Sequence, residues 1–217
     1  MKRLGLLVPS SNVVLEPLFK TVKTDVTIHV SRLGVLDVKL DRTSRAQFEL
    51  ESQLSAAKLL CDANVEAIVW GGTSASWLGI EHDINFVEKM RHLTGVPIGS
   101  CVLEINRQLG VLGAKRLGIV SPYTTDVADQ INNNYECMGF SIVASAHDGG
   151  DLSNDFANIP QHVIADMIQT VAAAKPDAIV LMCTNLAGAA LAKSLQDEVG
   201  CPIIDSAAAT LMAFNFL

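Results

Sequence analysis

The feature that most constrains the fold of this chain is an internal repeat. The first element, KRLGLLVP, returns in the second half of the chain as KRLGIVSP, and two shorter apolar segments also recur. The matched pairs are residues 2–9 with 115–122, 67–69 with 178–180, and 96–98 with 201–203. Three matches in the same order, at shifts of 113, 111 and 105 positions, indicate two related halves with a seam near residues 108–114.

Short apolar runs alternate with longer segments of helical pattern along the whole chain. The runs are continuous in Val, Ile and Leu, which is typical of parallel strands covered on both faces. We expect strands at residues 4–8, 26–31, 67–70, 97–101, 117–121, 140–144, 178–182 and 202–205, and helices at 44–63, 85–94, 126–138, 161–174 and 187–199. This alternation predicts βαβ units and therefore an α/β fold.

The repeat divides the predicted fold into two pseudo-symmetric α/β halves, each with a four-stranded parallel sheet. We assign residues 1–108 to the first half and residues 109–206 to the second. A last helix, at 207–217, is expected to pack back on the first half. The active site is expected in the cleft between the halves, because ligands of such sheets lie at the carboxyl ends of the strands.

The loops that follow the strands are therefore the candidate site. The repeat aligns Gly72 with Cys183, and it aligns the loop after residue 8 with the loop after residue 121. Small hydroxyl and amide side chains fill these loops, a composition suited to holding carboxylate oxygens. The candidate substrate-binding residues are Pro9, Ser11, Asn12, Gly72, Thr73, Ser74, Tyr123, Thr184 and Asn185.

Some of these residue types have a second interpretation, because Ser, Thr and Asn are also favoured at helix N-caps. The run from Thr73 to Ser76 fits either an oxyanion site or a cap. Ser11 and Asn12 fit either substrate binding or a cap for the helix that carries Glu16.

Cys183 is the candidate catalytic residue among five cysteines. It follows a buried strand and precedes a helix expected to begin at Asn185 or Leu186, whose dipole would favour a thiolate or a poised thiol. Cys183 also fits a simple packing role, since free Cys is commonly buried. We expect Cys183 to react fastest with iodoacetamide near neutral pH, and we expect packing roles for the others, which are Cys61, Cys101, Cys137 and Cys201.

Composition and missing motifs exclude several functions. The net charge of −7, with no Lys/Arg stripe, argues against nucleic acid as a partner. The first apolar run ends at Pro9, too short for a signal peptide, and no run is long enough to cross a membrane, so we expect a cytoplasmic protein.

No metal spacing or nucleotide motif occurs, and His82 with Asp83 is expected on the surface, so we expect no metal and no cofactor. The hydrophobic content of 49% suits a homo-oligomer.

The motifs at the strand ends resemble the aspartate/glutamate racemase superfamily over the whole chain, most closely its arylmalonate decarboxylase and maleate isomerase branch. Residues 5–12 with Glu16, and the Cys-Thr-Asn-Leu run at 183–186, are similar to maleate isomerases. Residues 72–77 (GTSASW) are similar to the first strand-end loop of the decarboxylase. Tyr123 with the following Asp126-Val127 is similar to the segment that carries the decarboxylase's active-site tyrosine.

The resemblance implies a cofactor-independent enzyme that acts on a small carboxylic acid. Racemases and maleate isomerases of this superfamily generally use two cysteines, one from each half, and Gly72 stands in place of the first. One cysteine suits decarboxylation through an enediolate that Cys183 protonates on a single face. The resemblance then implies that Thr73, Ser74 and Tyr123 hold the remaining carboxylate, with amides near Thr184 and Asn185, and that Trp70, Trp77 and Met182 line an apolar pocket.

Two alternatives remain open at this point. One is an isomerase, on maleate-like diacids or of the aspartate/glutamate racemase kind, and the other is a carboxylate-binding protein without turnover. Gly72 argues against the isomerase. We also expect a cysteine to fit at position 72, because glycine leaves the pocket empty there.

Overall fold

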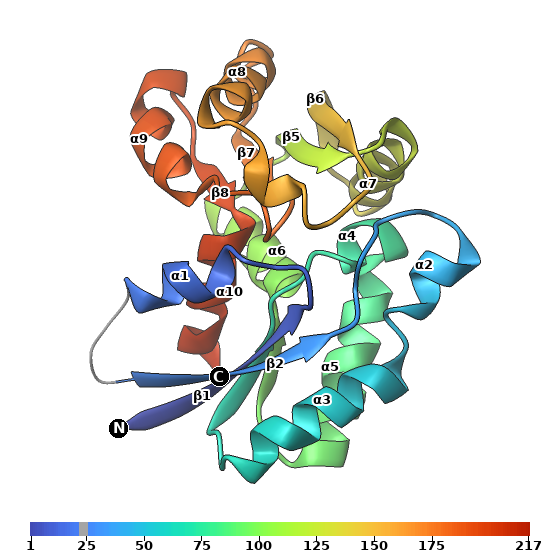
Figure 1. Cartoon of the computed structure of the whole chain (residues 1–217). Helices are drawn as coiled ribbons and strands as arrows, with labels where there is room; N and C mark the ends of the chain where they lie inside the picture. The colour runs from blue at the N-terminus through green and yellow to red at the C-terminus, as the bar shows by residue number, and fades with distance from the viewer. Residues whose placement is uncertain (22–25) are drawn as a thin grey trace.

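The computed structural model describes residues 1–21 and 26–217, and it contains two four-stranded parallel sheets (Figure 1). The first sheet has the order β2-β1-β3-β4, and the second has the order β6-β5-β7-β8. The first four strands are β1 (Lys2–Pro9), β2 (Val26–Leu33), β3 (Ala67–Trp70) and β4 (Ile98–Ser100). The last four are β5 (Arg116–Tyr123), β6 (Ser141–Gly150), β7 (Ala178–Leu181) and β8 (Ile203–Asp205). The predicted pair of parallel α/β halves is confirmed.

The two sheets repeat each other in register as well as in order. Leu4 pairs with Ala67 in the first sheet, and the equivalent Leu117 pairs with Ala178 in the second. Gly5, the repeated glycine of β1, has a packing reason: a Cβ there would lie 2.9 Å from Ile68. The same Cβ would lie 3.1 Å from Leu60 of a covering helix, so a side chain at this position would disturb the contact between helix and sheet, since protein interiors are close-packed.

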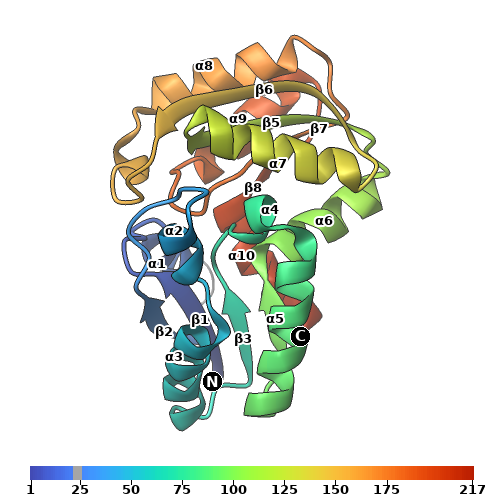
Figure 2. The same cartoon turned by 90° about the vertical axis from the view of Figure 1, so that its right-hand side faces the viewer.

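Helices cover both faces of each sheet, as parallel strands require. In the second half, α7 and α8 lie on opposite sides of β5 and β6 (Figure 2). In the first half, α3 and α5 cover one face, while α10 packs against β3, β4 and α1 on the other. The helices are α1 (Leu15–Lys20), α2 (Arg42–Ala46), α3 (Leu50–Asp62), α4 (Ala75–Leu78), α5 (Ile80–Thr94), α6 (Cys101–Leu112), α7 (Thr125–Cys137), α8 (Gln161–Ala172), α9 (Ala189–Val199) and α10 (Ser206–Ala213).

The helices α6 and α10 occupy equivalent places after the fourth strand of each half. Ser100 accepts a hydrogen bond from the N–H of Leu103 and so caps α6, and Asp205 accepts one from the N–H of Ala208 and caps α10. The two helices pack against each other, and α10 runs from β8 down onto the first sheet (Figure 1). The chain therefore ends against its first half.

Several predicted boundaries were wrong. The helix expected at 44–63 is two helices, because residues 47–49 leave the helical path and place Phe48 in the core. Helix α6 was missed because the apolar residues after Ser100 extend the pattern of β4, and Cys101 begins the helix instead of ending the strand. Strand β6 continues to Gly150. Among the described residues, no helix is long and apolar enough to cross a membrane.

Candidate active site

A small cavity lies between the halves at the carboxyl ends of the strands. Its volume is about 30 Å³, room for about two waters. Eight of the ten candidate residues line it, namely Pro9, Gly72, Thr73, Ser74, Tyr123, Cys183, Thr184 and Asn185. Its other walls are Val35, Val38, Phe48, Trp70, Trp77, Ser153 and Phe156. The lining therefore combines one thiol, several hydroxyls and an apolar wall, without a cationic side chain.

Amide and hydroxyl side chains tie the loops of the two halves together. Asn12 Nδ2 donates to Thr184 Oγ1 over 3.1 Å, and Thr184 Oγ1 donates to the carbonyl oxygen of Gly71 over 2.9 Å. Asn185 Nδ2 donates to the carbonyl oxygen of Ser153 over 2.6 Å, while its Oδ1 accepts a backbone N–H from the first half. The side chains of Thr184 and Asn185 thus hold the cavity wall in place and have their polar atoms engaged by protein groups.

Ser11 and Asn12 lie behind the cavity wall. Asn12 Oδ1 accepts from the N–H groups of Val14 and Leu15 just before and at the start of α1, whose N-cap residue is Val14, so the side chain orders the entry to this helix without being its N-cap. Ser11 Oγ donates to the carbonyl oxygen of Val35 over 2.9 Å. Both residues position the loops around the cavity rather than line it.

Three hydroxyl groups contribute to the polar lining of the cavity. The hydroxyls of Thr73 and Tyr123 share one hydrogen bond of 2.9 Å, and the Tyr123 hydroxyl also interacts with the Cys183 thiol. Ser74 Oγ accepts the indole N–H of Trp70 over 3.3 Å and keeps its own proton. Within the described chain, the backbone N–H groups of Thr73 and Thr184 have no protein acceptor. Such a set of donors suits the oxygens of a carboxylate or an enediolate.

The Cys183 thiol is buried at the meeting point of the loops. It is 4% exposed, and its Sγ accepts the N–H of Asn185 over 3.4 Å. Burial raises the pKa of Cys183 to about 11, although the Tyr123 hydroxyl and nearby amides lower it in part. The expected helix start at Asn185 or Leu186 was wrong: α9 begins at Ala189, six residues after Cys183, so its first turn does not adjoin the thiol. Cys183 is therefore a protonated acid near neutral pH.

This burial reverses the expected order of cysteine reactivity. We expect iodoacetamide at pH 7.5 to modify Cys137 first in the native protein, because Cys137 is exposed, whereas Cys183 is buried and its pKa is raised. Mass spectrometry of peptides from a time course measures the order. A parallel sample in urea, where all five thiols are accessible, is the control. First modification of Cys183 in the native protein would contradict the protonated, closed site.

Asp205 is a buried carboxyl group beside the end of β7. Its Oδ1 accepts the N–H of Ala208, and its Oδ2 has no hydrogen-bond partner among the described residues. Burial raises the pKa of Asp205 to about 7. A Cβ on Gly188 would lie 3.0 Å from this Oδ2, so the loop after Cys183 closes directly over the carboxyl group.

The raised pKa of Asp205 predicts a pH-dependent contribution to stability. The folded protein keeps this proton up to about pH 7, whereas the unfolded chain loses it near the ordinary value of 3.8. The contribution of Asp205 to the free energy of unfolding is therefore fully present below pH 4, and it is lost as the pH rises to 7. Relative to the unmodified protein, Asp205→Asn should gain up to roughly 4 kcal/mol between pH 4 and 7. Urea unfolding at pH 4 and pH 7 tests this, with the exposed Asp197→Asn as control. The same change in the free energy of unfolding between the two pH values in Asp205→Asn and in the unmodified protein would contradict the prediction.

The space at Gly72 differs from the sequence-based expectation. An ideal Cβ at Gly72 would lie 2.5 Å from Cε2 of Trp70 and closer still to Cζ2. The indole of Trp70 thus occupies the place where a side chain at position 72 would begin. The expectation that a cysteine fits at this position was wrong, because the direction of the Trp70 ring is not visible in the sequence.

The apolar wall contains residues that sequence patterns did not identify. Val35, Val38 and Phe48 reach the cavity from the segment after β2, and Ser153 and Phe156 reach it from the segment after β6. The two segments are joined by a β-bridge between residues 37 and 152. We call the joined segments, residues 34–40 and 151–155, the strap, and its side chains form part of the cavity wall. Trp70 and Trp77 line the cavity as expected, but Met182 is buried elsewhere.

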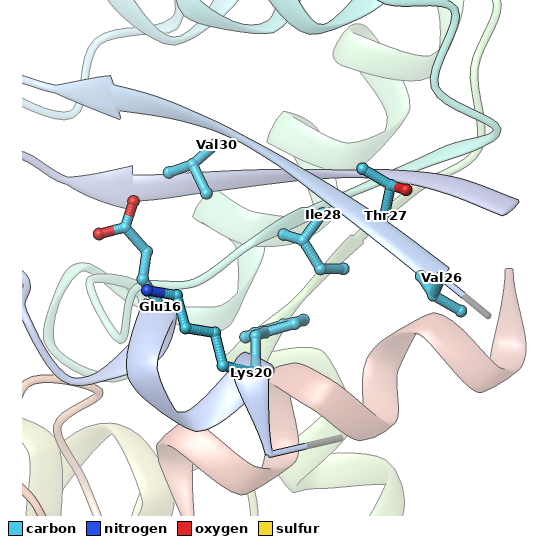
Figure 3. A pocket seen from close by; sticks show the side chains of 7 residues that line it. Glu16, Lys20, Val26, Thr27, Ile28 and Val30 are labelled. Atoms are coloured by element: carbon cyan, nitrogen blue, oxygen red, sulfur yellow. The ribbon is translucent and has the colours of Figure 1, made fainter. Parts of the chain in front are cut away.

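Other features of the molecule do not compete as the site. A larger hollow of about 490 Å³ lies between α1 and β2, where Glu16 and Lys20 face Val26, Ile28 and neighbouring residues (Figure 3). It lies away from the strand ends and contains no thiol. Asp83 is fully buried rather than on the surface, with Oδ1 3.8 Å from Nδ1 of His82. No group of three metal-ligating side chains is found in the described part of the chain.

Comparisons with known proteins agree with this architecture. The model of the arylmalonate decarboxylase family matches residues 4–215. The curated maleate isomerase of Nocardia farcinica is 24% identical over 232 residues, which cover 100% of this chain and 89% of that protein. A variant of the Nocardia farcinica maleate cis-trans isomerase with a covalently bound succinylcysteine intermediate has a TM-score of 0.87 at 20% identity, covering 100% of this chain and 91% of that one. A double variant of arylmalonate decarboxylase in the liganded form has a TM-score of 0.87 at 19% identity, covering 98% and 90%.

The family match extends over nearly the whole chain, and the relatives are covered almost to their full length. The chain belongs to the arylmalonate decarboxylase family of enzymes, in the branch of the aspartate/glutamate racemase superfamily that includes the maleate isomerases.

Proposed function

We propose that this protein is a cofactor-independent enzyme that acts on a small carboxylic acid and uses Cys183 as its one proton-transferring thiol. The observation that carries the proposal is the unequal pair of strand-end positions. Cys183 stands on one side of the cavity, while Gly72 has neither a side chain nor space for one. Reactions that need an acid–base group on both faces of a carbon are therefore disfavoured.

The reaction that this geometry supports best is decarboxylation of a small malonate. The bond between the α-carbon and one carboxylate breaks, carbon dioxide leaves, and the bonding electron pair forms an enediolate. In this proposal the hydroxyls of Thr73, Ser74 and Tyr123 stabilise the enediolate oxygens, which is supported by their positions in the cavity lining. The Cys183 thiol then gives its proton to the carbon, and the thiolate takes a proton from solvent. A thiol whose pKa is about 11 is protonated and ready for this step.

The lining of the cavity also suits this reaction. It contains the hydroxyls of Thr73, Ser74 and Tyr123 together with the apolar side chains of Val35, Val38 and Phe48. A carboxylate placed against apolar side chains loses hydration, which favours its departure as neutral carbon dioxide. The cavity volume of about 30 Å³ favours small substituents on the substrate and requires the strap of residues 34–40 and 151–155 to move as the acid enters.

Isomerisation of a maleate-like diacid is the second candidate. The named curated relatives support it better than they support decarboxylation, because they are maleate isomerases. The Cys-Thr-Asn-Leu run at 183–186 also favours it. This reaction would require Cys183 itself to act as the nucleophile, which its raised pKa disfavours.

A substrate panel separates these candidates. We expect carbon dioxide from methylmalonate or another small substituted malonate, with less from phenylmalonate, and no conversion of maleate to fumarate, both followed by NMR. Activity should survive dialysis against EDTA. Fumarate formation without carbon dioxide release would establish the isomerase instead. Binding of these acids without any turnover would leave a carboxylate-binding protein.

A further inference from the structure

The two halves differ at one pair of equivalent strand positions. Trp70 ends β3 and Leu181 ends β7, and the shared register of the two sheets makes these residues equivalent. Two residues further on, Gly72 is equivalent to Cys183. The first half thus has a large side chain followed by none, and the second has a medium side chain followed by a thiol. The half with the larger side chain at the strand end has the smaller one two residues later, which indicates that the side chains at the two positions share one space.

The indole of Trp70 folds back over the loop that follows β3. Its Cε2 lies 2.5 Å from the place of a Cβ on Gly72, much less than any real Cβ contact. The nearest atoms are all part of one rigid ring, so a side chain at position 72 cannot be accommodated by bending a flexible chain end. Only movement of the whole indole would admit it.

Two direct contacts hold the indole in this place, and a third supports one of them. Trp70 is fully buried, and its Nε1–H donates to Ser74 Oγ over 3.3 Å. The ring meets Phe48 edge to face, with 6.4 Å between ring centroids, and Phe48 in turn packs against Trp77 with 5.3 Å between centroids. An edge-to-face aromatic cluster with a satisfied indole N–H is a rigid arrangement. The ring is therefore a built part of the cavity wall.

We propose that Trp70 is the specificity-determining residue that makes the site one-sided: its indole fills the seat of a second acid–base side chain and limits the substituent that the substrate can carry on that face. The inference rests on the proposed function for its consequence in catalysis, but its packing basis does not. Exchange of an α-proton with inversion needs one group to remove the proton from one face while a second gives a proton to the other. Trp70 excludes that second group.

The packing part is tested by stability alone, with a double-mutant cycle of Gly72→Ala and Trp70→Leu. The leucine copies the equivalent Leu181. Overpacking of this kind should lower the urea midpoint of Gly72→Ala by about 1 M. Trp70→Leu should also lower it, yet the double variant should be more stable than the sum of the two losses predicts. Gly34→Ala is the control, because a Cβ there meets nothing within 4 Å.

The catalytic part is tested by Trp70→Leu combined with Gly72→Cys, which copies the Leu181/Cys183 pair. The product followed is 2-methylbutanoate, which 2-ethyl-2-methylmalonate yields on loss of carbon dioxide and which has one stereocentre. We expect this variant to exchange its α-hydrogen in D2O and to racemise it at least tenfold faster than the unmodified enzyme. Trp70→Leu with Gly72→Ala has the same space but no thiol and should not racemise the product. Trp70→Leu alone should accept a bulkier malonate.

Additive stability losses, or an unchanged midpoint in Gly72→Ala, would overturn the packing basis. Coupled losses without racemisation would overturn the role of Trp70 in one-sided proton transfer. If the unmodified protein releases no carbon dioxide from any malonate, the proposed function fails by itself, while the stability cycle still decides whether the indole holds the seat at position 72.

Discussion

Replacing Cys183 with alanine is expected to lower turnover of the substrate by a hundredfold or more, the usual scale for loss of a positioned general acid. Carbon–carbon cleavage does not need the thiol, but the enediolate that it leaves would have to take its proton from water in a closed cavity. The loss should therefore appear in kcat, with little change in KM, because the hydroxyls that hold the carboxylate remain. Single-turnover and steady-state assays on the best acid of the panel measure both quantities.

The matched control for this variant is Cys137→Ser. Cys137 is the exposed cysteine at the end of α7, so its replacement should leave kcat unchanged. Thermal unfolding of both variants checks that neither loss reflects misfolding. Activity of Cys183→Ala within twofold of the unmodified enzyme would remove Cys183 from the mechanism.

The second large effect is expected at Tyr123. Tyr123→Phe removes the hydroxyl that shares a hydrogen bond with Thr73, while the ring keeps its edge-to-face contact with Phe156 at 5.4 Å. Loss of one oxyanion donor costs about a hundredfold in kcat/KM. Because the two hydroxyls form one unit, Tyr123→Phe combined with Thr73→Val should cost less than the product of the single losses.

Tyr135→Phe is the matched control for the tyrosine. Tyr135 is equally buried, and its hydroxyl donates to Asn106 Oδ1 over 3.1 Å, outside the cavity. Its change removes the same atom and should leave kcat/KM within twofold, with a small loss of stability for the hydrogen bond. Equal losses of activity in both tyrosine variants would mean that Tyr123 acts only through stability.

The sequence predicted the architecture because a repeat carries information about pairing. Matched segments such as 2–9 and 115–122 imply matched strands, and both sheets adopt the same order and register. Strand ends then brought eight candidate residues to one cavity. Helix α6 was missed because local periodicity cannot separate the end of a short buried strand from the apolar start of a helix.

The details that decide the chemistry lie in contacts between distant residues. Phe48 and Phe156 reach the cavity from segments with no repeat or motif, and these segments are joined by the bridge between residues 37 and 152 and by the ion pair of Lys39 with Asp151. The direction of the Trp70 ring depends on Phe48 and Ser74 together, and the burial of Cys183 depends on both halves. Side-chain directions and pKa values of this kind follow from tertiary packing, which a single sequence does not display.

The most direct test of a single proton-giving thiol is the stereochemistry of the product. The substrate is 2-ethyl-2-methylmalonate, whose decarboxylation creates one stereocentre, and the reaction is run in D2O with the unmodified enzyme. Chiral chromatography with mass spectrometry should find a single enantiomer that carries one deuterium at the α-carbon and does not racemise on long incubation. A racemic product from the enzyme would contradict one-sided protonation by Cys183.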